Sequence, residues 1–178
     1  GDAAPPILNN VILSNHAMYG GGIVLNFCSG ALVRNDNIAE NRVDQAASGA
    51  PTFGGGAIWV NDILPGATAA NVIENNTIVG NSSSGIQNSA VAGQGGAFVV
   101  WNNARAAARN NIVWANTQAL GEQIFISGAS FALTYSNIAD GLAGDGNFSL
   151  APAFADSGFY LSESSPCIDA GDPEAQHN

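Results

Sequence analysis

Two short motifs recur along the chain, and their repetition limits its fold more than any other feature. One motif starts with glycine and continues as an apolar run, at residues 20–26, 55–61 and 95–101. The other reads approximately Asn-Asn-x-Ile-x-x-Asn, at residues 9–15, 35–41, 75–81 and 110–116. The order of the motifs is fixed while their spacing varies, which is typical of a solenoid whose constant coils carry loops of different length.

Strand alternation predicts which side chains of the coils point inward. Three inward columns are expected, and their members are Ile12, Ile38, Ile78 and Val113; Ile23, Ile58 and Phe98; and Leu25, Val60 and Val100. The last asparagine of each Asn motif should stack at a corner and tolerate left-handed backbone there. These residues are Asn15, Asn41, Asn81 and Asn116.

We therefore predict an all-β fold, a right-handed parallel β-helix of about four to five coils. Residues 1–140 should form the coils, the first of them incomplete, and residues 141–178 a closing segment packed on the helix. Loops rich in Gly, Ala, Ser and Pro are expected at residues 42–53, 63–70 and 82–94. The alanine-rich residues 104–108 lack a sustained helical period and are interpreted as a turn and a strand.

Charge is scarce and one-sided. There are 14 acidic and 4 basic residues, which gives a net charge of −10. Such a balance argues against nucleic acid, anionic membrane surfaces and polyanions bound without metal ions. No apolar stretch is long enough to predict membrane insertion. The two cysteines, Cys28 and Cys167, are compatible with a disulfide or with two thiols.

The motifs resemble those of secreted bacterial right-handed parallel β-helix repeat proteins and are similar to the repeats of polymorphic outer-membrane proteins. The end of the chain resembles the closing segment of such cell-surface proteins, through residues 134–138, 146–148, 152–154 and 165–173. The resemblance covers nearly the whole chain. It implies an extracellular or cell-surface location, in a family that mixes polysaccharide lyases, hydrolases, adhesins and other surface proteins.

The chain opens on an Asn motif without a preceding glycine motif. We therefore expect it to be a fragment of a longer surface protein. An incomplete first coil would leave strand edges uncovered, and such edges invite association. This predicts self-association through the ends of the coils.

Two tryptophans are the most informative side chains for function. Trp59 and Trp101 occupy outward positions of the glycine motif, with Asn26 and Asn61 in register with Trp101. Exposed together, they would form a platform on which sugar rings stack. The alternative is that loops cover the tryptophans or that they contact another protein. Trp114 lies on another face and is expected under a loop.

Carboxylates offer a second set of candidates. Asp36, Glu40 and Asp62 are the residues of a catalytic site, if there is one, and Glu74 is a further partner for Asp36. A hydrolase of sugars needs two carboxylates roughly 5 to 9.5 Å apart. The alternative for these residues is a solvated face with an incidental ion pair.

Metal sites have little support in the sequence. Asp140 and Asp145 lie in a glycine-rich loop that offers oxygen ligands for Ca²⁺, but their spacing fits no EF-hand loop and a plain turn is the favoured interpretation. His16 and His177 are isolated, so zinc is not expected. We therefore expect no cofactor, and Ca²⁺ is the one alternative left open.

Together these features favour a non-catalytic extracellular module of a surface or adhesion protein, with polysaccharide or cell-surface glycan as its ligand. The alternative is a fragment of a polysaccharide lyase or glycoside hydrolase with the β-helix fold.

Overall fold

The computed structural model describes residues 4–44, 52–85 and 91–174. The described chain contains 18 short strands in four parallel sheets and no helix. Sheet 1 consists of β1 (Ile7–Leu8), β5 (Leu32–Arg34), β9 (Asn71–Glu74), β13 (Arg105–Arg109) and β17 (Ser130–Thr134). Sheet 2 consists of β2 (Val11–Leu13), β6 (Asn37–Ala39), β10 (Thr77–Val79), β14 (Ile112–Trp114) and β18 (Asn137–Ile138).

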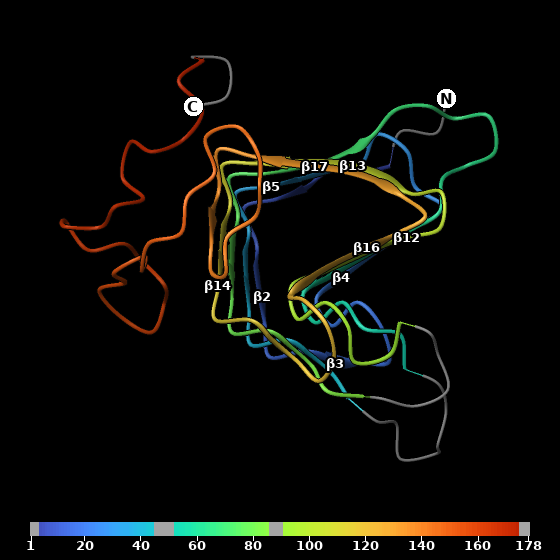
Figure 1. Cartoon of the computed structure of the whole chain (residues 1–178), viewed down its shortest axis with the longest axis horizontal. Helices are drawn as coiled ribbons and strands as arrows, with labels where there is room; N and C mark the ends of the chain where they lie inside the picture. Colours follow the sequence, from blue (N-terminus) through green and yellow to red (C-terminus); the bar gives the residue numbers. More distant parts are fainter. Residues whose placement is uncertain (1–3, 45–51, 86–90, 175–178) are drawn as a thin grey trace.

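The other two sheets have four strands each. Sheet 3 consists of β3 (His16–Ala17), β7 (Arg42–Val43), β11 (Ser82–Ser83) and β15 (Thr117–Gln118). Sheet 4 consists of β4 (Ile23–Asn26), β8 (Ile58–Asn61), β12 (Phe98–Trp101) and β16 (Ile124–Ser127). Each strand pairs with the strand four places further along the chain, so the chain visits the four sheets in turn. The predicted parallel β-helix is confirmed, and Figure 1 shows the stacked coils as a repeated outline.

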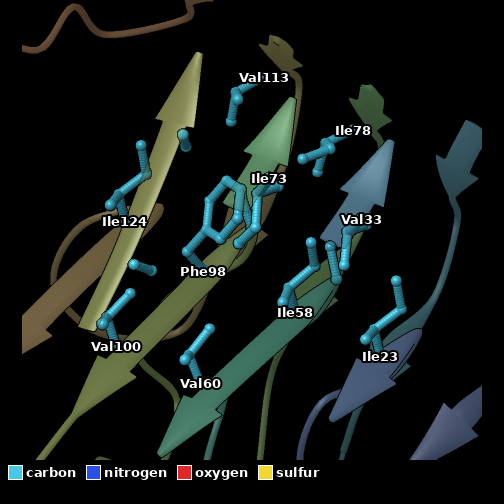
Figure 2. Close-up of a cluster of buried hydrophobic side chains, with 14 of the residues drawn as sticks. Ile23, Val33, Ile58, Val60, Ile73, Ile78, Phe98, Val100, Val113 and Ile124 are labelled. Carbon is cyan, nitrogen blue, oxygen red and sulfur yellow. The ribbon is translucent and has the colours of Figure 1, made fainter. Parts of the chain in front are cut away.

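The predicted inward columns are also confirmed. Ile38, Ile78 and Val113 are in register on sheet 2 and fully buried, and Ile138 continues the column. Ile58 and Phe98 are in register on sheet 4, and Ile124 continues that column. Figure 2 shows members of both columns facing one another across the interior: Ile78 and Val113 on one side, and Ile58, Phe98 and Ile124 on the other. β-branched residues suit this packing because they fill the space between neighbouring coils.

A buried ladder of asparagines runs along the corner between sheets 2 and 3. Asn41 donates its backbone N–H and its Nδ2 to Oδ1 of Asn81, both at 3.0 Å. Asn81 does the same to Asn116, at 3.0 and 2.9 Å, and Asn15 does it to Asn41. Each amide thus satisfies two donors of the preceding coil, which matters because buried polar groups are costly when unpaired.

The prediction of left-handed backbone at these asparagines was wrong by one position. The left-handed residues precede the ladder asparagine and include Glu40 (φ 56°), Gly80 (φ 65°) and Ala115 (φ 52°). The ladder asparagine itself must aim its amide along the solenoid axis, so the turn is made one residue earlier.

A second ladder, which the sequence analysis missed, runs along the corner between sheets 1 and 2. Asn76 donates its backbone N–H and Nδ2 to Oδ1 of Asn111, both at 3.0 Å. The members of this ladder in chain order are Asn10, Asp36, Asn76, Asn111, Ser136 and Asn147. Three residue types share one role here, so the repeat is less visible in the sequence.

The glycine motif has two separate physical causes. Its first glycine is left-handed at Gly55 (φ 71°) and Gly95 (φ 60°), as a sharp corner requires. Its second glycine allows close approach of coils, since a Cβ on Gly56 would collide with the carbonyl oxygen of Gly96 and lie 2.7 Å from the backbone of Ser82.

The structure corrects the boundaries of two predicted loops. Residues 42–43 and 82–83 are the strands β7 and β11, so those loops begin later than expected. Parts of these loops, residues 45–51 and 86–90, lie outside the described residues. The alanine-rich run expected to form a strand is β13, as predicted.

The C-terminal segment lies on the outside of the coils, beside sheet 2 (Figure 1). Hydrogen bonds attach it there: Asn137 Nδ2 donates to the carbonyl of Leu150, Asn37 Nδ2 to that of Gly158, and the N–H of Asp172 to Oδ1 of Asn110. Phe148 forms a parallel bridge to Asn137 and so covers the last strand of sheet 2.

Candidate functional site

The ring of Trp59 lies on the outward side of β8, as predicted, but it is not open to solvent. Its neighbours Tyr19, Phe53 and Trp101 have ring centroids 5.7 to 5.9 Å away, and Val91 completes the cover. Only 4% of Trp59 is exposed. For Trp59 the structure therefore agrees with the alternative, cover by residues outside its strand, and the ring is not part of an open platform.

Trp101 remains partly exposed at the end of β12, beside a run of asparagine side chains. Asn61 Nδ2 donates to Oδ1 of Asn26 at 2.7 Å, and Asn102 Nδ2 donates to Oδ1 of Asn61 at 2.6 Å. Asn61 is in register with both Asn26 and Trp101 on sheet 4. We call Asn26, Asn61, Trp101 and Asn102 the amide face. It combines a partly exposed aromatic ring with the exposed amide of Asn26 and the partly exposed amides of Asn61 and Asn102.

The three candidate catalytic carboxylates hold different places in the coil. Asp36 and Glu40 lie at opposite ends of β6, and Asp62 follows β8 on sheet 4. Asp36 is buried in the second ladder, where Oδ1 accepts from the N–H and Nδ2 of Asn10. Glu40 accepts from the hydroxyl of Ser14, and Asp62 accepts from the N–H of Ile63. Each of the three carboxylates thus has a local structural contact.

Glu74 belongs to an ion-pair cluster on sheet 1 that the sequence analysis did not find. Arg34, Glu74 and Arg109 are in register on three neighbouring strands. Arg34 Nε donates to Oε1 of Glu74 at 2.5 Å, and Nη2 of Arg109 lies 2.5 Å from Oε2 of Glu74. Glu74 is nearly buried, so the two arginines compensate a charge that would be costly alone. Each of these three residues comes directly before the first asparagine of an Asn motif, and this shared position was the signal available in the sequence.

A pocket of about 490 Å³ lies between the C-terminal segment and the corner of sheets 1 and 2. Its lining is aromatic, amide and carboxylate in character and includes Asn75, Tyr135, Phe148, Cys167 and Asp169. Asn137 Nδ2 lies 3.0 Å from the sulfur of Cys167. The pocket arises where the C-terminal segment crosses the coils, which no local sequence pattern reveals. Cys28 and Cys167 are both free thiols, so they do not form a disulfide with one another.

The residues considered for metal binding are dispersed. Asp140 accepts a hydrogen bond from Gln123 Nε2 at 3.4 Å, and Asp145 is exposed. His16 contacts Asp44, while His177 lies outside the described residues. Within residues 4–44, 52–85 and 91–174, three or more His, Cys, Asp or Glu side chains do not gather at one point.

In the described ranges, no helix is long and apolar enough to cross a membrane. No family model, curated protein or solved structure matches the chain. The parallel β-helix with its asparagine ladder is thus shown by the structure, and the resemblance to surface-protein repeats stays a prediction from the motifs.

Proposed function

We propose that this chain is a non-catalytic extracellular β-helix module of a surface or adhesion protein, and that its amide face binds carbohydrate. The observation that carries the proposal is the alignment of Asn26, Asn61 and Asn102 beside the partly exposed ring of Trp101. Amides exchange hydrogen bonds with sugar hydroxyls, and an aromatic ring packs against the apolar face of a sugar.

The architecture supports a ligand that runs along the solenoid axis. Successive coils repeat at about 4.8 Å, the ordinary spacing of hydrogen-bonded strands. The amides of the face come from three successive coils, so they form a row along that axis. A row of repeated polar groups suits a glycan chain better than a single small molecule.

Charge favours a neutral glycan. The chain carries a net charge of −10, and none of the four members of the amide face is basic. An acidic polysaccharide would be repelled at long range, because like charges reduce the local concentration of a ligand.

Trp101→Ala is expected to lower the affinity for a neutral glycan about tenfold, the factor that corresponds to a loss of 1.4 kcal/mol of stacking energy. The test is a glycan array followed by titration calorimetry with the best neutral glycan. Trp114→Ala is the matched control, because Trp114 is also partly exposed but lies on sheet 2. It should bind as the unchanged chain does.

Two results would contradict this proposal. One is a glycan that binds equally well to the Trp101→Ala variant, which would place the binding elsewhere. The other is release of unsaturated or reducing ends from polysaccharides incubated with the chain, with or without Ca²⁺. That release would establish the alternative hypothesis, in which the chain belongs to a polysaccharide lyase or glycoside hydrolase.

A further inference from the structure

The asparagine ladders have a direction. In each step from one asparagine to the next, the earlier coil supplies the donors, a backbone N–H and Nδ2, and the later coil supplies the acceptor Oδ1. A further bond runs back: the residue after the ladder position donates its N–H to the backbone carbonyl of the earlier coil. Asn37 donates in this way to Asn10, and Arg42 to Asn15.

The first coil therefore presents a defined set of groups at its outer edge. Strands β1 to β4 are the last strands of their sheets on this side. Within the described residues, Oδ1 of Asn10 and of Asn15 receives none of the ladder bonds that the later asparagines receive. Val11 and His16 are in register with Asn37 and Arg42, so their N–H groups point toward the same edge.

At the opposite end of the solenoid, both ladders end on other side chains of this chain. Asn116 Nδ2 donates to Oε1 of Gln123 at 3.4 Å, which ends the first ladder. In the second ladder, the N–H of Ser136 donates to Oδ1 of Asn147 at 3.0 Å, and Asn147 Nδ2 donates to the carbonyl of Leu133. The two ends are therefore chemically different.

We propose that the edge formed by β1 to β4 is a docking surface for a parallel β-helix coil carrying the same Asn motif. The two ladder asparagines of that coil would donate to Oδ1 of Asn10 and Asn15, and their backbone carbonyls would accept from Val11 and His16. Apolar side chains at the same edge, Leu8, Val11 and Leu13, are exposed and add area to the contact.

A second copy of this chain fits the edge poorly. Two such edges brought together would place acceptor against acceptor at Asn10 and Asn15. The far end of a second copy has its ladder donors engaged by Gln123 and Asn147. The self-association expected from exposed strand edges is thus replaced, in this proposal, by association with a coil that brings free donors.

The experiment attaches such a coil to the full chain. A copy of residues 75–101 is placed directly before Gly1, so that residues 1–8 stand between the copied Trp101 and Asn9 as residues 102–109 stand between Trp101 and the equivalent Asn110. The copied Asn76 and Asn81 then supply the donors. The control carries the same copy with Asn76→Asp and Asn81→Asp, which keeps the shape of the side chains and removes the Nδ2 donors.

Amide hydrogen exchange by NMR reads the result. The proposal expects the N–H groups of Val11 and His16 to exchange at least about tenfold more slowly with the Asn copy than in the unextended chain or the Asp control. Equal protection by the two copies would overturn it. So would fast exchange at Val11 and His16 while the chain's own β10 stays protected, because the copied coil has then not docked. A concentration-dependent dimer of the unextended chain that protects both amides would overturn it in favour of a second copy.

Discussion

Replacing Asn81 by Leu is expected to lower the free energy of unfolding by about 3 to 4 kcal/mol, although Leu has a similar shape. The reason is the ladder: the N–H and Nδ2 of Asn41 both donate to Oδ1 of Asn81, and both residues are fully buried. Each donor left without an acceptor costs about 1 to 3 kcal/mol. Urea unfolding followed by circular dichroism measures the change.

Asn15→Leu is the matched control for this prediction. Asn15 belongs to the same ladder but lies exposed in the first coil, so its replacement should cost about 1 kcal/mol or less. If both variants lose the same stability, burial of the ladder does not contribute as the structure indicates.

Asp36→Asn is expected to raise the free energy of unfolding by about 1 to 2 kcal/mol. Asp36 takes a position that asparagine holds in the next two coils, and its Oδ2 is buried without a hydrogen-bond partner. At this position Asn76 Nδ2 donates to the carbonyl of Val33, and Val33 is in register with Ile7. An amide at residue 36 could donate to the carbonyl of Ile7 in the same way.

Glu40→Gln is the matched control, because it removes the same charge from an exposed position at the other end of β6. It should change stability by less than about 0.5 kcal/mol, as surface substitutions usually do. A similar gain from both variants, in the same urea titration, would assign the effect to the reduced net charge instead of the completed ladder.

The sequence predicted the fold well because the strongest constraint on a parallel β-helix repeats in every coil. Ile38 and Ile78 must fill the same place in successive coils, so the same residue type recurs at a fixed point of the motif. Asn41 and Asn81 recur for the same reason, since an amide side chain can accept from the preceding coil and donate to the next one.

Other features left weaker traces. The strands of sheet 3 are two residues long, as at β7 and β11, which is too short for an alternating pattern. Burial of Trp59 depends on Phe53 and Val91, which lie outside its strand and follow no repeat. The position of a residue on the outward side of a strand could be predicted, while its exposure depended on loops that vary from coil to coil.

Buried asparagine ladders hold the coils together, and hydrogen exchange of side-chain amides tests this role most directly. In a ¹⁵N-labelled chain, the Nδ2 protons of Asn76, Asn81 and Asn111 should exchange far more slowly than those of exposed Asn26 and Asn103, because the first three are buried and hydrogen-bonded. Exchange of all five side-chain amides at the same fast rate, while the backbone of the strands stays protected, would contradict the account.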